Sequence, residues 1–351
     1  MKKQKKYFIK KTDRVKKTRT SLAAKIAIGL AILLLFFAGF MLHRPAGTVT
    51  ENFRYGVAFS RIFSEQMGLD WRENYLAVLT DLQPEFLRLP VYWQDIEKTK
   101  GAFEFTDYDW MVNEAEKSGI KLVLVVGRKT PRWPECNLPD WAKQIPEEEQ
   151  KMRVLNQLEK IVTRYKDQKN LYAWQVENEP FLQFGDCKLM GADFLDEEIA
   201  LVRKLDQNRH PIMVTDSGEL SLWVQAAKRA DIFGTTMYRI VHSPRFGYIE
   251  YPLPPRFFWL KANLVHLLYP DRPMIVSELQ TEPWGPRLIY DISIEEQMKT
   301  MTFEHFKSNI EYAKAVGFPD IYLWGAEWWY WMKQNQDRPE YWNEAQKIFK
   351  H

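Results

Sequence analysis

From residue 52 onward, short apolar runs rich in β-branched and aromatic residues alternate with longer segments whose apolar residues recur at helical spacing. This alternation predicts a parallel β-sheet whose strands are joined by crossover helices. The predicted strands are Tyr55–Phe59, Phe86–Leu89, Lys121–Gly127, Leu171–Val176, Pro211–Thr215, Asp231–Met237, Met274–Ser277 and Asp320–Trp324. The helical patterns between them include Asp70–Leu82, Asp107–Ser118, Glu147–Tyr165, Ala192–Leu205, Ser221–Ala230, Ile294–Ala315 and Glu340–Lys350.

Eight strand–helix units in about 300 residues match the size of a (β/α)8 TIM barrel. We therefore predict an α/β fold in which residues 52–351 form one barrel domain. A doubly wound open sheet is the rival architecture, but it usually carries a glycine-rich first turn. The sequence Gly-Val-Ala-Phe-Ser at residues 56–60 is not such a turn, so the barrel is favoured.

The N-terminal stretch differs sharply from the rest, because residues 1–25 hold eleven Lys or Arg and one Asp, whereas residues 26–42 carry no charge. As a helix this apolar run would span about 26 Å, close to the hydrocarbon core of a bilayer at about 30 Å. We predict a transmembrane or signal-anchor helix over residues 26–42, a basic cytoplasmic leader over residues 1–25, and a linker over residues 43–51. The alternative is a cleaved signal peptide. The barrel domain would then be secreted rather than anchored in the cell membrane, and in both cases it lies outside the cytoplasm.

The formal net charge of +3 hides an uneven distribution. Residues 1–25 carry +10, so the remainder carries −7, and this mildly acidic body argues against a nucleic-acid partner. The two cysteines, Cys136 and Cys187, fall in predicted loops on one face of the barrel and form either a disulfide or two free thiols. No histidines are paired at ligand spacing, and no Walker or Gly-x-Ser-x-Gly motif occurs, so we expect neither a metal nor another cofactor.

Candidate chemistry lies where barrel enzymes carry it, at the carboxyl ends of strands and in the loops after them. Glu179 follows the fourth predicted strand and Glu278 follows the seventh, on opposite sides of the barrel mouth. Cleavage of a glycosidic bond requires two carboxylates facing one sugar ring, and double displacement places them no more than about 6 Å apart. Glu177 and Glu282 are the nearest competitors for these two positions.

These residues stand in motifs that resemble glycoside hydrolase clan A, the retaining glycosidases built on a (β/α)8 barrel. The motifs are Asn-Glu-Pro at residues 178–180 and an apolar run that ends in Ser-Glu at residues 277–278. Trp-Gln-Asp-Ile-Glu at residues 93–97 and Pro-Arg-Trp at residues 131–133 are similar to the opening third of clan members in families 42, 39 and 5. The resemblance extends over residues 52–330. Arg-Lys-Thr at residues 128–130 stands where several families carry a histidine, which is a departure from family 5.

The resemblance implies that Glu179 is the general acid/base and that Glu278 is the nucleophile of a covalent glycosyl-enzyme. Arg88 and Tyr238 would donate hydrogen bonds that keep Glu278 charged, and Asn178 would bind the 2-hydroxyl of the sugar.

Residues at the end of the eighth strand and directly after it supply the remaining predicted contacts. Trp324 would lie under the sugar, and Glu327 or Trp328 would contact its outer hydroxyls. Weaker candidates for substrate contacts are Trp93, Trp133, Trp284 and His242.

The predicted activity is therefore retaining hydrolysis of β-glycosidic bonds in an extracytoplasmic oligo- or polysaccharide. A transglycosylase that uses the same site, with a sugar hydroxyl in place of water, is an alternative. A second alternative is a non-catalytic carbohydrate-binding barrel at the cell surface, although such a protein has no need for both Glu179 and Glu278.

Overall fold

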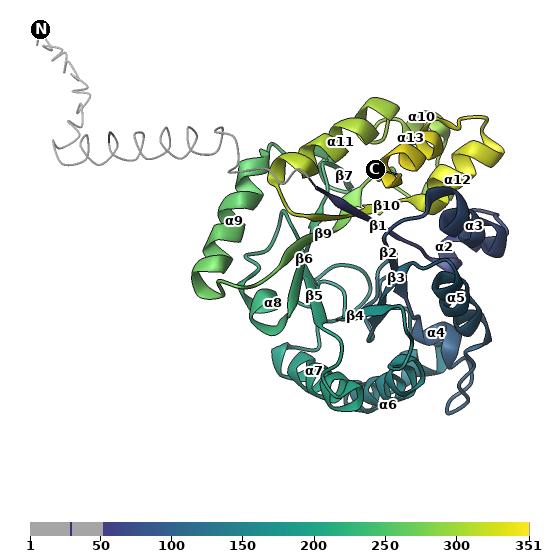
Figure 1. Ribbon diagram of the computed structural model, residues 1–351, viewed down its shortest axis with the longest axis vertical. Coiled ribbons are helices and arrows are strands. Elements are labelled where there is room, and N and C mark those ends of the chain that lie inside the picture. The colour runs from purple at the N-terminus through teal and green to yellow at the C-terminus, as the bar shows by residue number, and fades with distance from the viewer. Residues whose placement is uncertain (1–28, 30–51, 351) are drawn as a thin grey trace, which may run out of the picture. The chain divides into compact units, whose positions relative to one another are not determined.

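The protein folds as an eight-stranded parallel barrel, which the computed structural model describes over residue 29 and residues 52–350 (Figure 1). The barrel strands are β1 (Arg54–Ala58), β2 (Phe86–Pro90), β3 (Lys121–Val126), β4 (Leu171–Val176), β5 (Ile212–Asp216), β6 (Ile232–Met237), β9 (Met274–Gln280) and β10 (Asp320–Trp324). They pair in that order, and β10 closes the barrel on β1. Each predicted strand overlaps an observed one, so the predicted (β/α)8 fold is confirmed.

Helices form a ring around the strands (Figure 1). They are α2 (Arg61–Gln66), α3 (Trp71–Ala77), α4 (Trp93–Ile96), α5 (Thr106–Lys117), α6 (Glu147–Tyr165), α7 (Ala192–Asp206), α8 (Val224–Arg229), α9 (Pro255–Leu268), α10 (Ile294–Gln297), α11 (Phe303–Val316), α12 (Ala326–Asn335) and α13 (Glu340–Phe349). Shorter helical turns are η1 (Val78–Leu82), η2 (Asp140–Gln144) and η3 (Ile289–Asp291).

The long predicted helix Ile294–Ala315 is two helices in the structure. The side chain of Thr302 accepts the backbone N–H of His305, and the His305 ring faces the backbone N–H of Thr302, so a capping box starts α11. A hairpin that the sequence analysis did not predict, β7 (Ile240–Ser243) with β8 (Gly247–Glu250), follows β6.

The lower interior of the barrel is apolar and tightly filled. Its buried side chains come from seven strands and are Phe86, Val123, Ala173, Met213, Ile232, Ile275 and Tyr322. The first strand contributes Gly56, where a Cβ atom would lie 2.7 Å from the Tyr322 ring, so only glycine leaves room for this tyrosine. Two residues further along their strands, the buried residues Arg88, Gln175 and Thr215 replace this apolar layer with a polar one. Because side chains alternate along a strand, this polar layer lies directly above the apolar one, toward the carboxyl ends of the strands.

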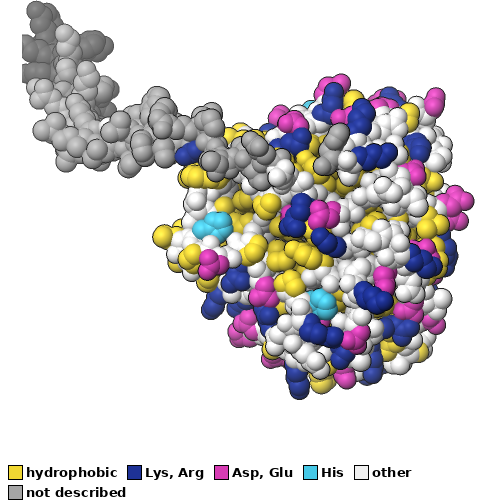
Figure 2. Space-filling model, viewed as in Figure 1, with side chains coloured by type: hydrophobic (Ala, Val, Ile, Leu, Met, Phe, Trp, Pro, Cys, Tyr) yellow, Lys and Arg dark blue, Asp and Glu magenta, His cyan; other side chains and the backbone are white. Residues whose placement is uncertain are grey.

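The predicted leader (residues 1–25) and linker (residues 43–51) lie outside the described residues, as does the predicted membrane segment (residues 26–42) apart from residue 29. Within the part of the chain that is described, no helix combines the length and apolar character needed to cross a bilayer. Acidic and basic side chains are interspersed over the face of the barrel shown in Figure 2.

Candidate active site

A β-bulge in β9 directs Glu278 into the barrel mouth. Thr235 of β6 pairs with Val276, but the next residue, Thr236, pairs with Glu278, so Ser277 is an extra residue on β9. Without the bulge, side chains would alternate strictly along β9, and the Glu278 side chain would point away from the barrel interior. A bulge re-aims the residues that follow it, which places Glu278 beside the inward-facing Thr236.

Both carboxylate oxygens of Glu278 accept hydrogen bonds. Arg88 Nη1 donates to Oε1 at 2.6 Å, and the Tyr238 hydroxyl donates to Oε2 at 2.9 Å. The Arg88 guanidinium has no exposed surface, and it is fixed by Gln175 Oε1 at 2.7 Å and Asn178 Oδ1 at 2.8 Å. Charge-assisted hydrogen bonds of this kind stabilise the ionised carboxylate. The structure thus brings Arg88 and Tyr238 to Glu278, as the sequence analysis predicted, and it also places Asn178 beside Arg88.

Glu179 has a different environment. It follows β4 in a left-handed backbone conformation, with a φ of 43°, and its own N–H donates to Thr215 Oγ1 at 3.1 Å. The Thr236 hydroxyl donates to its Oε1 at 3.1 Å. Burial, followed by the nearby carboxyls of Glu135 and Glu278, raises the pKa of Glu179 well above its usual value. Glu179 is therefore suited to carry a proton.

Glu177, the competitor of Glu179, holds two loops together. Its carboxylate accepts the backbone N–H groups of Arg128 and Lys129, each at 2.6 Å. This contact joins the β3 loop (residues 127–139) to the β4 loop (residues 177–191). Gly127 has a φ of 122°, and a Cβ atom there would lie 2.5 Å from Glu177 Oε1, so the close approach requires glycine.

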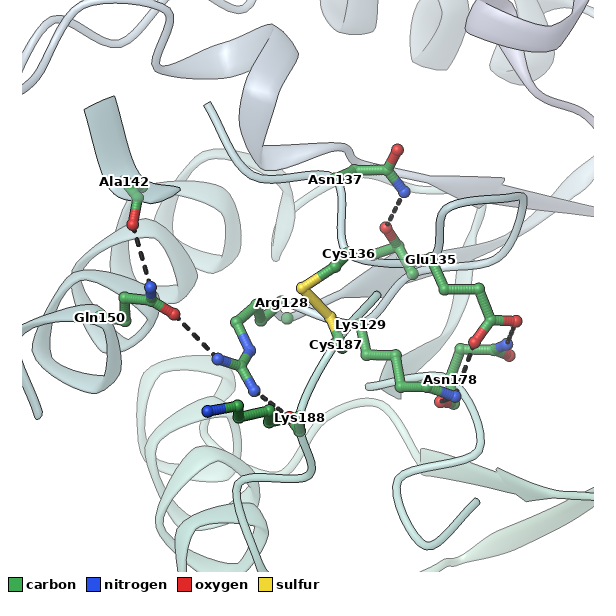
Figure 3. The surroundings of a disulfide bond; sticks show 12 residues. Arg128, Lys129, Glu135, Cys136, Asn137, Ala142, Gln150, Asn178, Cys187 and Lys188 are labelled. Atoms are coloured by element: carbon green, nitrogen blue, oxygen red, sulfur yellow. Dashed lines mark hydrogen bonds and ion pairs between the residues drawn. A yellow bond between two sulfur atoms is a disulfide. The ribbon is translucent and has the colours of Figure 1, made fainter. Parts of the chain in front are cut away.

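A disulfide between Cys136 and Cys187 joins the same two loops (Figure 3). The structure therefore settles the question that the sequence left open in favour of pairing. Near the bridge, Asp186 N–H donates to the Pro134 carbonyl at 3.0 Å. Gly185 is close enough to that carbonyl that a Cβ atom would lie 2.4 Å from its oxygen.

The β3 loop also brings two charged residues that the sequence analysis did not identify, Lys129 and Glu135. Lys129 Nζ lies 2.6 Å from Glu135 Oε2, and Asn178 Nδ2 donates to Glu135 Oε1 at 3.3 Å (Figure 3). Both are almost fully buried. Their proximity to Cys136 and to the Arg-Lys-Thr segment was visible in the sequence, but their contact with Asn178 depends on how the two loops pack.

Glu282, the competitor of Glu278, belongs to an ion-pair cluster centred on Arg132. The Arg132 guanidinium pairs with Glu282 and, at 2.9 Å, with Glu327. Glu327 also accepts the backbone N–H of Ser60. Burial raises the pKa of Glu282 to about 7, even though Arg132 opposes this shift. Glu327 has no exposed surface, so its contacts are internal and its predicted role as a sugar contact gains no support.

The tryptophans predicted to contact sugar near β10 are also enclosed. The Arg132 guanidinium lies 4.0 Å from the centre of the Trp324 ring, and only 6% of Trp324 is exposed. Trp328 has no exposed surface, because it packs against Tyr341 and its indole N–H donates to Gln297 Oε1 at 2.7 Å. The substrate roles of both residues remain predictions, and Trp328 offers no atom for such a contact.

An aromatic row instead leads away from Glu278. Tyr238 contacts Trp284 with ring centres 5.2 Å apart, Trp284 contacts Phe184 at 5.6 Å, and Phe184 contacts Trp133 at 6.0 Å. Half of the Trp133 side chain is exposed. The sequence analysis ranked Trp133 and Trp284 as weak candidates and missed Phe184, because ring-to-ring order between separate loops is not encoded in spacing.

The two other weak candidates lie elsewhere. Trp93 is buried and donates to Glu97 Oε2 at 2.6 Å. His242 belongs to the hairpin and packs against Tyr248 at 5.0 Å. Within the described part of the chain, no three His, Cys, Asp or Glu side chains are grouped so as to hold a metal ion.

Comparison with known proteins agrees with this architecture. A sequence model of glycosyl hydrolase family 10 matches residues 90–213, about a third of the chain. The β-galactosidase of the Antarctic haloarchaeon Halorubrum lacusprofundi is similar in structure, with a TM-score of 0.53 and 16% identity over 77% of this chain and 52% of that one. The family 42 β-galactosidase Gan42B of G. stearothermophilus gives a TM-score of 0.57 and 12% identity over 88% of this chain and 57% of that one. The exo-β-1,4-mannosidase Op5Man5 of an Opitutaceae bacterium gives a TM-score of 0.53 and 13% identity over 81% of this chain and 54% of that one.

The chain thus spans about half the length of these three proteins, and at such low identity they share its fold alone. The family 10 match confirms the resemblance to barrel glycosidases and supports the predicted class, glycoside hydrolase, and the solved structures agree with it in fold. They do not assign the chain to one family within that class.

Proposed function

We propose that the protein is a retaining β-glycoside hydrolase in which Glu278 is the nucleophile and Glu179 the general acid/base. The observation that carries this proposal is the contrast between the two carboxyls. Glu278 receives hydrogen bonds from Arg88 and Tyr238, whereas burial and neighbouring carboxyls raise the pKa of Glu179 well above its usual value. Environments that separate two carboxyls in this way define an acid and a charged partner.

The proposed reaction has two displacements. Glu278 attacks the anomeric carbon, the bond to the leaving oxygen breaks, and that oxygen takes the proton of Glu179. The ionised Glu179 then removes a proton from water, whose oxygen attacks the anomeric carbon and releases Glu278. Arg88 and Tyr238 stabilise the carboxylate charge at the start and at the end of the cycle. The short carboxyl separation that this mechanism needs stays a prediction.

The aromatic row supports a carbohydrate substrate. Tyr238 both touches Glu278 and begins the row that continues through Trp284 and Phe184 to the exposed Trp133. Rings of this kind offer apolar faces on which sugars stack. We propose that the row binds further sugar units of a β-linked oligosaccharide beyond the unit held by Glu278.

Covalent trapping tests the proposal. Incubation with a panel of 2-deoxy-2-fluoro β-glycosides, followed by peptide mapping, should place one label on Glu278 and identify the sugar. Glu278→Gln should take no label. The control Glu282→Gln should still be labelled, because the Glu282 carboxylate pairs with Arg132. A label on Glu282, or no label with any sugar of the panel, would contradict the assignment.

We further propose that the barrel domain lies outside the cytoplasm, anchored through residues 26–42. The Cys136–Cys187 disulfide supports this location, because such bonds persist in oxidising compartments. In intact cells, added protease should digest a tag placed after residue 351 and spare one placed before residue 1. Protection of the C-terminal tag would contradict the proposal.

A further inference from the structure

A third carboxyl and a second cation complete the catalytic site. Lys129 donates to the backbone carbonyls of Asn178 at 3.0 Å and Glu179 at 3.3 Å, and it pairs with Glu135 at 2.6 Å. Glu135 in turn accepts the Asn178 amide N–H. The Lys129–Glu135 pair therefore contacts both residues of the Asn-Glu motif from the side of the β3 loop.

The charges of this cluster do not balance. It holds three carboxyls, those of Glu135, Glu179 and Glu278, but only two cations. Arg88 pairs with Glu278, and Lys129 pairs with Glu135. Glu179 has no cationic partner among the described residues; its carboxyl meets the Thr236 hydroxyl. A buried acid without a counter-charge retains its proton, and a neighbouring negative charge reinforces this.

The groups that face Glu179 come from every element around it. They are Glu135 and Lys129 of the β3 loop, Asp216 of β5, Tyr238 after β6, and Glu278 of β9. Glu278 must stay charged for the reaction, and Asp216 is turned toward the backbone N–H of Ser217 at 2.9 Å. Glu135 is thus the negative group beside Glu179 that the proposed chemistry does not otherwise use.

We propose that Glu135 is a positioning residue: held by Lys129 and Asn178, it fixes a negative charge beside Glu179 and so keeps the proton of the site on Glu179. The disulfide at the adjacent Cys136 holds the segment that carries it (Figure 3). This inference rests on the proposed role of Glu179. Burial raises the pKa of Glu135 to about 7, although the Lys129 ammonium opposes this shift, so the Glu135 carboxyl is charged above that pH.

The test separates charge from shape. Glu135→Gln keeps the acceptor for Asn178 but removes the charge, whereas Glu135→Asp keeps the charge on a shorter side chain. With methyl β-glycosides, whose poor leaving group needs the proton, the basic limb of the kcat/KM pH profile should move at least about one pH unit lower in Glu135→Gln. It should stay in place in Glu135→Asp and in the exposed control Glu148→Gln, whose side chain is 82% exposed.

A second readout does not depend on turnover. In protein labelled with ¹³C at glutamate carboxyls, the Glu179 signal, assigned with Glu179→Gln, should titrate at lower pH in Glu135→Gln than in the wild type. Glu135→Asp, which keeps the charge, should leave this titration in place. Equal Glu179 titration in the wild type and in Glu135→Gln would overturn the inference, whereas a failure to trap Glu278 would overturn only the proposed function.

Discussion

Arg88 is the residue on which the predicted site residues converge. Its guanidinium donates to Gln175, Asn178 and Glu278 at 2.6–2.8 Å, and it is fully buried. A planar group with five donors can satisfy three acceptors in one plane, which a lysine in its place would not do. The arginine thus orients Glu278 and the Asn-Glu turn with one rigid group.

Tyr238→Phe tests the second donor to Glu278. The variant loses the hydrogen bond at 2.9 Å but keeps the ring contact with Trp284. A hydrogen bond to a charged group contributes about 1.5–3 kcal/mol, so kcat should fall roughly 10–100-fold. The control Tyr75→Phe loses a buried bond to the Met111 carbonyl, remote from the site, and should lower stability but not kcat. Equal kcat in the two variants would show that the Tyr238 hydroxyl does not support the proposed role of Glu278.

The sequence predicted that Arg88 and Tyr238 meet Glu278, but it did not predict contacts whose partners come from other loops. Glu278, Arg88, Tyr238 and Asn178 lie in barrel strands or directly after them, and the topology alone brings the carboxyl ends of the strands together. Glu327 follows a strand end as well, but inside the fold its carboxylate pairs with Arg132 and accepts the backbone N–H of Ser60. Spacing along the chain contains no information about such a partner.

At the scale of elements, the site depends on two loops that are packed unusually closely. The Glu177 carboxylate, the Cys136–Cys187 disulfide and the approach of Gly185 to Pro134 all join the β3 loop to the β4 loop. Positive φ angles at Glu177 and Glu179 show that the β4 loop leaves its strand abruptly. The alternation of side chains along β4 therefore does not determine where the carboxyl of Glu179 points.

Gly185→Ala tests this packing against a matched glycine. Gly185 and Gly119 have nearly equal φ angles, 73° and 70°, but only at Gly185 does a Cβ atom meet neighbours. Both substitutions should cost about 1–2 kcal/mol for the left-handed backbone. Gly185→Ala should cost roughly 1–3 kcal/mol more and lower activity, because the loops must separate. Urea unfolding and kcat/KM measure both effects, and equal losses would show that the loop contact is unimportant.

Removal of the disulfide tests the same pair of loops. The bridge closes a segment of 51 residues, and crosslinks of this size typically contribute about 2–4 kcal/mol. Cys136→Ser/Cys187→Ser should lower the free energy of unfolding by that amount in denaturant titrations. The wild type in reductant should approach the variant, and identical curves without reductant would contradict a stabilising role.

At the scale of the whole molecule, the alternation of short apolar runs with helical segments was sufficient to predict eight strands and a closed barrel. The runs are nearly continuous because every barrel strand is buried on both faces. The bulge at Ser277 was not predictable. It is a property of the pairing between β6 and β9, and one extra residue changes the direction of Glu278 without altering the apolar pattern of Met274–Val276. The fold is thus specified mainly by local pattern, whereas the direction of the Glu278 side chain is specified by register.

The barrel also concentrates buried acids at its mouth, and this predicts how its stability depends on pH. Burial raises the pKa values of Glu135, Glu219 and Glu282 from 4.5 to about 7, against weaker lowering by nearby cations or backbone N–H groups. Between these values the folded protein binds protons that the unfolded chain has released. The free energy of unfolding should therefore fall as the pH rises from about 4.5 through 7.

Glu219→Gln isolates one of these groups. Its carboxylate accepts the backbone N–H of Tyr238 at 2.8 Å, and an amide oxygen can keep that bond without a charge. The variant should be more stable than the wild type at pH 8 by about 1–3 kcal/mol and nearly equal to it at pH 4.5, because the wild-type carboxyl is then neutral. Urea unfolding at both pH values, with Glu311→Gln on the exposed face of α11 as control, measures the difference. A variant that is no more stable than the wild type at pH 8 would show that Glu219 is ionised in the fold without penalty.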